Sequence, residues 1–128
     1  MSDREKKIKR IAAVRKELHR LAEWKLRYGM RTDAVLKNRQ DDLLHFLDND
    51  TAYTGRFALT AMLRLRHVAE MRRRLASERE TLIKQVLEEG RLLRLSERML
   101  RDVEQERRDE MQYRDLEEVI EASLTPRK

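Results

Sequence analysis

The chain has 128 residues, of which 42% are charged, 40% hydrophobic and only 5% aromatic, and its formal net charge is +6. This composition leaves too little apolar material for a large globular core, and it favours long helices or a coiled coil over a sheet protein. The absence of cysteine excludes a disulfide framework and a cysteine-based zinc site. No apolar run approaches the length of a membrane span and no apolar segment follows the charged first residues, so we expect a cytoplasmic protein.

We predict a first helix over about residues 3–48, with Ser2 or Asp3 capping its first turn. Gly29 followed by Thr32 offers an alternative, in which one helix ends and another begins at that point. Trp24 is expected to pack against a second helix, or else to be an exposed interface anchor. The apolar residues of this segment recur at three- and four-residue steps in two stripes of different phase: Ile8, Ile11, Val14, Leu18 and Leu21, then Leu36, Leu43 and Leu47.

The segment 49–55 is the one strong break in the chain, and we predict a bend there. Three aromatic residues, Phe46, Tyr53 and Phe57, gather around it. They could plug the end of a helical hairpin, or they could form a tip that binds a partner.

A second helix is predicted over about residues 56–124, because Pro126 disfavours continuation. Its apolar residues follow a heptad pattern with polar interruptions, the signature of a coiled-coil seam. The positions of this seam are Ala61, Leu65, Val68, Arg72, Leu75, Arg79, Leu82, Val86, Glu89, Leu93, Ser96, Leu100 and Val103.

The fold class expected is all-α: one domain, residues 1–128, forming a long antiparallel two-helix coiled-coil hairpin in which the second helix overhangs. If the chain folds back near Thr51, Asp3 lies beside about Leu100, and about 35 Å of helix beyond Arg101 has no partner in the chain. A bare helix of this length is marginal in water. The overhang should therefore dock into another protein through its apolar residues, Met111, Tyr113, Leu116, Val119, Ile120 and Leu124.

The sequence offers little to catalysis, because its three histidines are scattered and form no recognisable arrangement with a nucleophile. We expect no enzyme, no cofactor and no metal. Asp41, Asp42, His45 and Asp48 share one helical face, as metal ligands would, but a solvated polar face explains them better. The arginines at 72–74 could meet phosphates; a charged helix face is favoured, and no nucleic-acid partner is expected.

The segment from Gly90 to Leu100, GRLLRLSERML, leads into the acidic ending EMQYRDLEEVI at residues 110–120. This ending, in a basic-then-acidic helical hairpin with a longer second helix, resembles the FliJ family of flagellar type III export proteins and similar injectisome stalk proteins. The resemblance covers mainly residues 92–124. It implies a non-enzymatic central stalk of an export ATPase ring, linked to the export gate, with a further role in escorting export chaperones. It also implies a cytoplasmic protein that is peripheral at the inner membrane through the export apparatus.

The partners that the resemblance implies are a hexameric export ATPase, an export gate membrane protein and export chaperones. The bend end, with Phe46, Tyr53 and Phe57, would face the gate. A structural scaffold that acts as a homodimer is the alternative function, in which two chains cover each other's overhangs. The residues expected at the ATPase end are Arg4, Lys6, Lys7, Arg107, Arg108, Tyr113, Arg114, Leu116 and Ile120.

Overall fold

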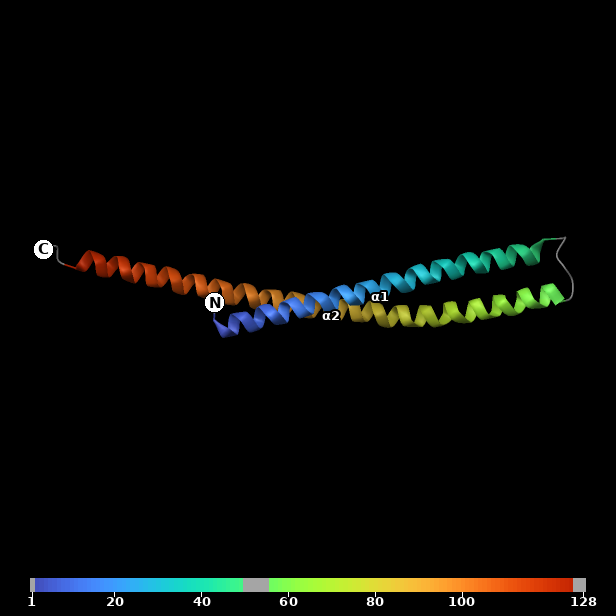
Figure 1. Cartoon of the computed structure of the whole chain (residues 1–128), viewed down its shortest axis with the longest axis horizontal. Helices are drawn as coiled ribbons and strands as arrows, with labels where there is room; N and C mark the ends of the chain where they lie inside the picture. The colour runs from blue at the N-terminus through green and yellow to red at the C-terminus, as the bar shows by residue number, and fades with distance from the viewer. Residues whose placement is uncertain (1, 50–55, 126–128) are drawn as a thin grey trace. The chain divides into compact units, whose positions relative to one another are not determined.

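The computed structural model describes residues 2–49 and 56–125. It contains two helices, α1 over Asp3–Asp48 and α2 over Arg56–Leu124 (Figure 1). The all-α class and both helix boundaries are confirmed. Tyr53 and the other residues of the predicted bend from 50 to 55 lie outside the described residues.

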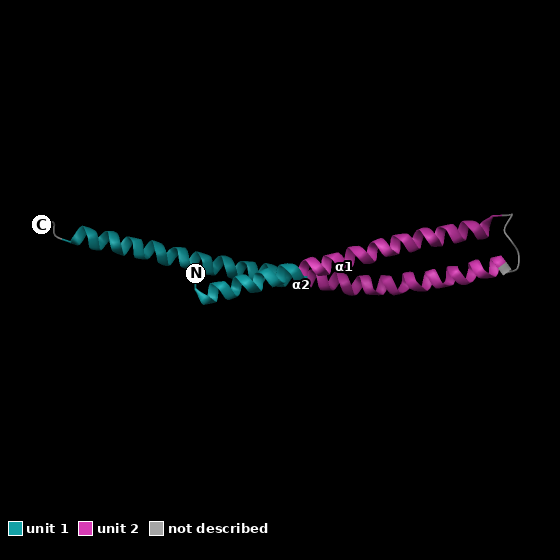
Figure 2. Cartoon of the chain, viewed as in Figure 1, with its two compact units in different colours: residues 1–18, 90–128 teal, residues 19–89 magenta. Residues whose placement is uncertain are grey.

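The chain divides into two compact units, each built from a segment of both helices (Figure 2). Unit 1 comprises Met1–Leu18 and Gly90–Lys128, and unit 2 comprises His19–Glu89. In each unit the α1 segment packs antiparallel to the α2 segment. This arrangement is the two-helix hairpin that the heptad pattern predicts, with α2 as the longer helix.

The seam of α2 is the one predicted from its heptads. Of its thirteen positions, all but Arg79 are buried or half-buried, and Ala61, Val68, Ser96 and Val103 are the most buried. The hydroxyl of Ser96 donates a hydrogen bond to the Leu92 carbonyl oxygen at 3.0 Å, which satisfies this polar group inside the helix itself. Polar residues therefore enter the seam without breaking its register.

The seam of α1 differs from the predicted stripe by one residue. Ile8 is buried as expected, but Ile11, Val14, Leu18 and Leu21 are exposed. The buried or half-buried positions instead follow an unbroken heptad, Glu5, Ile8, Ala12, Arg15, His19, Ala22, Leu26, Gly29, Asp33, Leu36, Gln40, Leu43 and Leu47.

A prediction based on large apolar residues misses this seam, because small and polar side chains occupy much of it. Ala12 and Ala22 are buried, and an alanine in the seam lets the facing helix approach closely. Arg15 and His19 reach the edge of the seam with partly apolar side chains. The predicted phase shift after Leu21 is wrong, since the same register runs from one end of α1 to the other.

α1 also continues through Gly29, so the alternative of two shorter helices is wrong. A Cβ added at Gly29 would meet nothing within 4 Å, so this glycine is not required by close packing. Thr32, the candidate cap, donates its hydroxyl to the Tyr28 carbonyl oxygen at 2.9 Å, which is a bond within a continuing helix. An isolated glycine costs a helix only about 1 kcal/mol, which the surrounding turns tolerate.

Within unit 1 the two helix segments overlap further than predicted. Glu5 is 2% exposed, and its carboxylate lies 3.6 Å from a guanidinium nitrogen of Arg107. Val103 is buried in the seam. The start of α1 therefore lies beside residues 103–107 rather than beside Leu100, and the overhang begins at Arg108 rather than at Arg101.

Candidate partner-binding surface

The start of α1 is fixed by a local cap. The Ser2 hydroxyl oxygen accepts a hydrogen bond from the Glu5 backbone N–H at 3.2 Å, and the Lys6 N–H donates to the Ser2 carbonyl oxygen at 3.0 Å. Ser2 is thus the N-cap, one of the two candidates from the sequence. This cap places Glu5 in the first turn, where its carboxylate pairs with Arg107.

The expected ATPase-end residues fall into two groups. Arg4, Lys6 and Lys7 are exposed on the first turns of α1, and Arg107 meets this region through Glu5. The others lie further along α2, on the segment that continues past the seam. The structure therefore brings Arg107 to the basic start of α1, but it does not gather the full predicted set, whose remaining members are Arg108, Tyr113, Arg114, Leu116 and Ile120.

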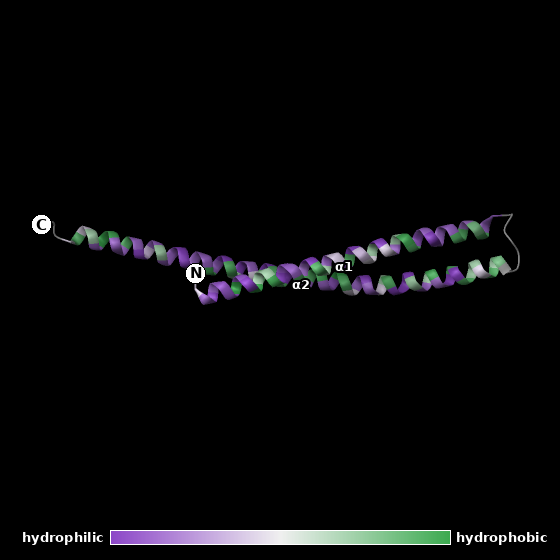
Figure 3. Cartoon of the chain, in the orientation of Figure 1, coloured by the Kyte–Doolittle hydropathy of each residue, from purple (hydrophilic) through white to green (hydrophobic). Residues whose placement is uncertain are grey.

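We call residues 108–124 the C-terminal extension. Every residue of it is helical and exposed, and apolar residues recur among hydrophilic ones along it (Figure 3). Pairing with α1 stops before it, because α1 begins at Asp3 and Glu5 already lies beside Arg107. Its apolar stripe, Tyr113, Leu116 and Ile120, lies one residue before the seam positions Arg114, Glu117 and Glu121.

Unit 1 also carries an exposed apolar surface, whose α1 part belongs to the first predicted stripe and whose α2 part was not predicted. Ile11, Val14 and Leu18 on α1 are exposed, as are Leu95 and Met99 on α2. Each of them stands one residue before a seam position. The signal that could have revealed this surface is a second apolar heptad stripe adjacent to the first.

In unit 2, Trp24 does not pack into the seam. It is 55% exposed and Tyr28 is 61% exposed. The two rings stack on each other, with centroids 5.4 Å apart and planes inclined by 20°. The alternative of an exposed aromatic anchor thus fits better than packing against α2.

The bend-end aromatics differ in environment. Phe46 is half-buried near the end of α1, whereas Phe57 is exposed near the start of α2. Tyr53 lies outside the described residues. The two described rings thus belong to the ends of different helices, and Phe57 presents apolar surface there.

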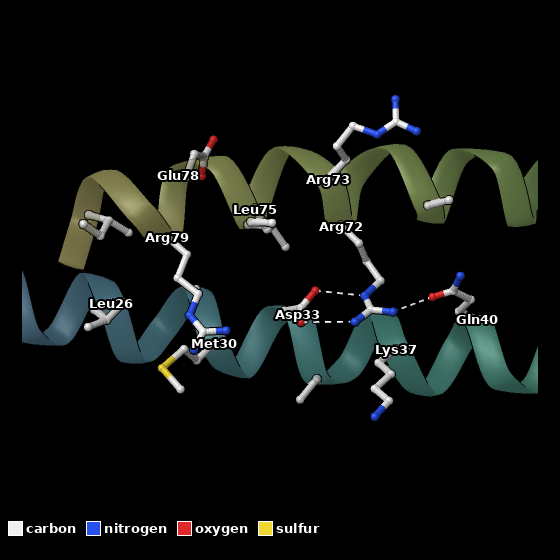
Figure 4. Close-up of a pocket in the computed structure, with 15 residues that line it drawn as sticks. Leu26, Met30, Asp33, Lys37, Gln40, Arg72, Arg73, Leu75, Glu78 and Arg79 are labelled. Atoms are coloured by element: carbon white, nitrogen blue, oxygen red, sulfur yellow. Dashed lines mark hydrogen bonds and ion pairs between the residues drawn. The ribbon is translucent and has the colours of Figure 1, made fainter. Parts of the chain in front are cut away.

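A polar cluster lies in the seam of unit 2 (Figure 4). Arg72 donates from Nε to the Asp33 carboxylate at 3.0 Å and from a second nitrogen at 3.4 Å, and it also donates to the Gln40 side-chain oxygen. This fork lowers the pKa of Asp33, first through the hydrogen bond from Arg72 and then through the nearby positive charges of Arg72, Arg79 and Lys37. It also raises the pKa of Arg72.

An open groove of about 600 Å³ adjoins this fork, with Leu26, Met30, Leu75 and Leu82 among its lining residues. Arg79 extends from α2 toward α1 beside it, exposed rather than laid along the seam (Figure 4). The Arg72 fork joins one helix to the other through paired polar groups. Its geometry suits the setting of register rather than proton transfer, because the only ionised carboxylate in the fork is already held by the guanidinium.

The remaining polar candidates do not converge. Among residues 2–49 and 56–125, no three His, Asp or Glu side chains gather as metal ligands would, so Asp41, Asp42, His45 and Asp48 share a face without forming a cluster. His19 lies 3.0 Å from Glu23 along the same helix. Over the same residues, neither helix has a stretch that is apolar enough and long enough to cross a membrane.

Comparisons with known proteins add no functional information, so the proposal below is argued from the surfaces of the structure. Neither a scan against protein-family models nor searches of the curated proteins and the solved structures found a match to this chain.

Proposed function

We propose that this chain is a non-catalytic helical interaction protein that engages a protein partner through its C-terminal extension. The observation that carries the proposal is the complete exposure of residues 108–124. An amphipathic helix that is bare in water gains stability by laying its apolar side into a groove of another protein. Tyr113, Leu116 and Ile120 supply the three- and four-residue anchor spacing that this mode of binding uses.

The resemblance to the FliJ family gives this proposal a specific form. In that form the partner is the hexameric export ATPase, the hairpin is its central stalk, and the bend end with Phe46 and Phe57 meets the export gate. An elongated stalk needs a charged surface and long continuous helices, both of which the chain has. Membrane association would then come through these partners, and export chaperones would be further ones.

The test measures binding to, and ATP hydrolysis by, a hexameric export ATPase from the same organism. The full chain is compared with a chain ending after Arg107, which keeps Val103 and the Glu5–Arg107 pair and removes only the extension. The proposal expects binding and stimulated hydrolysis by the full chain and loss of both on truncation. Full activity of the truncated chain would remove the role of the extension, and no binding by the full chain would remove the stalk.

The second candidate function is a homodimeric scaffold. It is favoured by the exposed apolar surface of unit 1, because a monomer would leave both this surface and the extension in water. The two functions differ in what covers the extension, another protein or a second copy of this chain.

A further inference from the structure

We propose that, in the absence of another partner, two copies of this chain pair reciprocally, with the C-terminal extension of each seated on the apolar flank of unit 1 of the other. The unit-1 flank comprises Ile11, Val14 and Leu18 on α1 with Leu92, Leu95 and Met99 on α2. The inference rests on the proposed function only in using the extension as the docking segment.

The six residues of the unit-1 flank lie on one side of the helix pair. Each stands one position before a seam residue, such as Val14 before Arg15 and Leu95 before Ser96. In an antiparallel pair of right-handed helices, positions that precede the seam fall on the same side of both helices. The flank is therefore a shallow apolar face with contributions from α1 and α2.

The opposite side of unit 1 has a different character. The positions that follow seam residues are Lys9, Ala13 and Lys16 on α1, and Arg94, Glu97 and Arg101 on α2. Charged side chains dominate this side, so among the described residues of unit 1 the flank is the more apolar of the two sides. A partner helix would pack on that one side.

The stripe of the extension matches the flank in spacing. Tyr113, Leu116 and Ile120 are separated by three and four residues, as are Leu92, Leu95 and Met99, and as are Ile11, Val14 and Leu18. The extension is about 25 Å long, which is enough to lie along all of these positions. A third helix with this periodicity can insert its anchors between the two helices of the flank.

Charge complementarity selects the occupant. The extension has six acids and two arginines. The body of unit 1 has the opposite balance: residues 2–18 have seven Lys or Arg against three acids, and residues 90–101 have four Arg against Glu97 alone. Opposite charges of this kind steer association and fix which surfaces meet.

The extension cannot reach the flank of its own chain, because it continues α2 as one uninterrupted helix past Glu5 and Arg107. A second copy related by a twofold axis removes this obstacle. If the axis passes near Glu106, Leu116 of one copy lies near Leu95 of the other and Tyr113 lies near Met99. Both contacts then form twice, and the assembly closes as a dimer.

Acidic side chains near the proposed axis would repel each other, and basic side chains of unit 1 lie beside them. Asp102 and Glu106 occupy the flank side of α2, while Arg4 and Lys7 occupy the flank side of α1 next to them. Because these side chains are exposed, salt screens their attraction. The dimer should therefore weaken as ionic strength rises.

Sedimentation equilibrium of the full chain in 0.1 M salt tests the proposal. We expect a monomer–dimer equilibrium, weakened at least about tenfold by Val14→Asp and by Leu116→Asp, since charge at an apolar contact costs more than one factor of ten in affinity. Val35→Asp is the matched control, because Val14 is 58% and Val35 57% exposed on the same helix, but Val35 belongs to unit 2. It should leave the dimer unchanged.

Crosslinking gives a second readout, because the natural chain has no cysteine. A chain with Leu18→Cys and Leu116→Cys should form a covalent dimer on mild oxidation, whereas Val35→Cys with Leu116→Cys should not, because Leu18 lies level with Leu95 on the unit-1 flank and Val35 lies in unit 2. A strictly monomeric wild type, or a Val14→Asp dimer as tight as the wild type, would overturn the proposal. Failure to bind the export ATPase would remove the stalk and leave this dimer intact.

Discussion

Arg72 and Asp33 join the two helices of unit 2 by a forked ion pair, with Nε of the guanidinium 3.0 Å from the carboxylate. Both are seam positions, and both side chains are about one-third exposed. The side-chain oxygen of Gln40, one heptad after Asp33, accepts a hydrogen bond from another nitrogen of the same guanidinium. The fork therefore joins one position of α2 to two seam positions of α1 that are a heptad apart, with Leu36 between them, and a slipped register would break it.

The contribution of the Asp33–Arg72 ion pair to stability should depend on pH. The folded state lowers the pKa of Asp33 through the Arg72 hydrogen bond, so the pair stabilises the fold above the ordinary carboxyl pKa of about 3.9 and loses this contribution as pH falls below it. We expect the melting temperature of the wild type to exceed that of Asp33→Asn at pH 7, and the difference to shrink by pH 3. Thermal unfolding at pH 7 and pH 3, followed by circular dichroism, measures the difference in melting temperature. The same difference at both pH values would contradict a charge effect.

The corrected phase of α1 can be checked at two adjacent residues. Leu36 is 4% exposed in the seam, whereas Val35 beside it is exposed. Leu36→Ala should lower the free energy of unfolding by about 2–3 kcal/mol, and Val35→Ala by no more than about 0.5 kcal/mol. Urea unfolding gives both values, and similar losses at the two sites would mean that the seam has another phase.

Ala22 is 2% exposed in the seam, so we expect a larger side chain there to clash with the facing helix. Ala22 is buried in the seam, while its neighbour Leu21 is exposed. Ala22→Leu adds apolar atoms but should still destabilise by about 1–3 kcal/mol through overpacking. Ala13→Leu, at an exposed site of α1, is the control and should be near neutral; a stabilised Ala22→Leu would show that the helices are not closely apposed there.

The cap at the start of α1 should be worth a measurable amount. Ser2→Ala removes the acceptor for the Glu5 N–H and should cost about 1 kcal/mol, whereas Ser2→Asp should retain the bond. Ser123→Ala serves as a control, since that hydroxyl only donates to a carbonyl of its own helix, from Ile120. Unfolding in urea distinguishes them, and equal effects of Ser2→Ala and Ser2→Asp would count against the cap.

Glu5 and Arg107 test where the paired part of unit 1 ends. The Glu5 carboxylate is buried beside Arg107, so Arg107→Ala should destabilise the fold by removing its cation. Glu5→Leu should be better tolerated, because an apolar side chain suits a seam position. Amide exchange of residues 3–10 compares the two variants, and we expect faster exchange in Arg107→Ala. Faster exchange in Glu5→Leu would contradict the prediction.

The sequence by itself determined the fold class, the boundaries of both helices and the seam of α2. These follow from local signals: a serine cap, a cluster of turn residues, and leucines and valines in one heptad phase. The exposed amphipathic ending of α2 was also readable, because its apolar spacing continues where the first helix has already run out.

Only the tertiary structure decided which face of α1 meets α2, where the overlap of the helices ends, and which apolar residues remain exposed. Two adjacent stripes of α1 were both compatible with a coiled coil. The stripe richer in large apolar residues, from Ile11 to Leu21, is exposed. The seam is formed instead by the stripe that contains Ala12, Ala22 and Asp33. The reason is physical: burial depends on what the facing helix can approach and pair with, and that information is held by α2, not by the local sequence of α1.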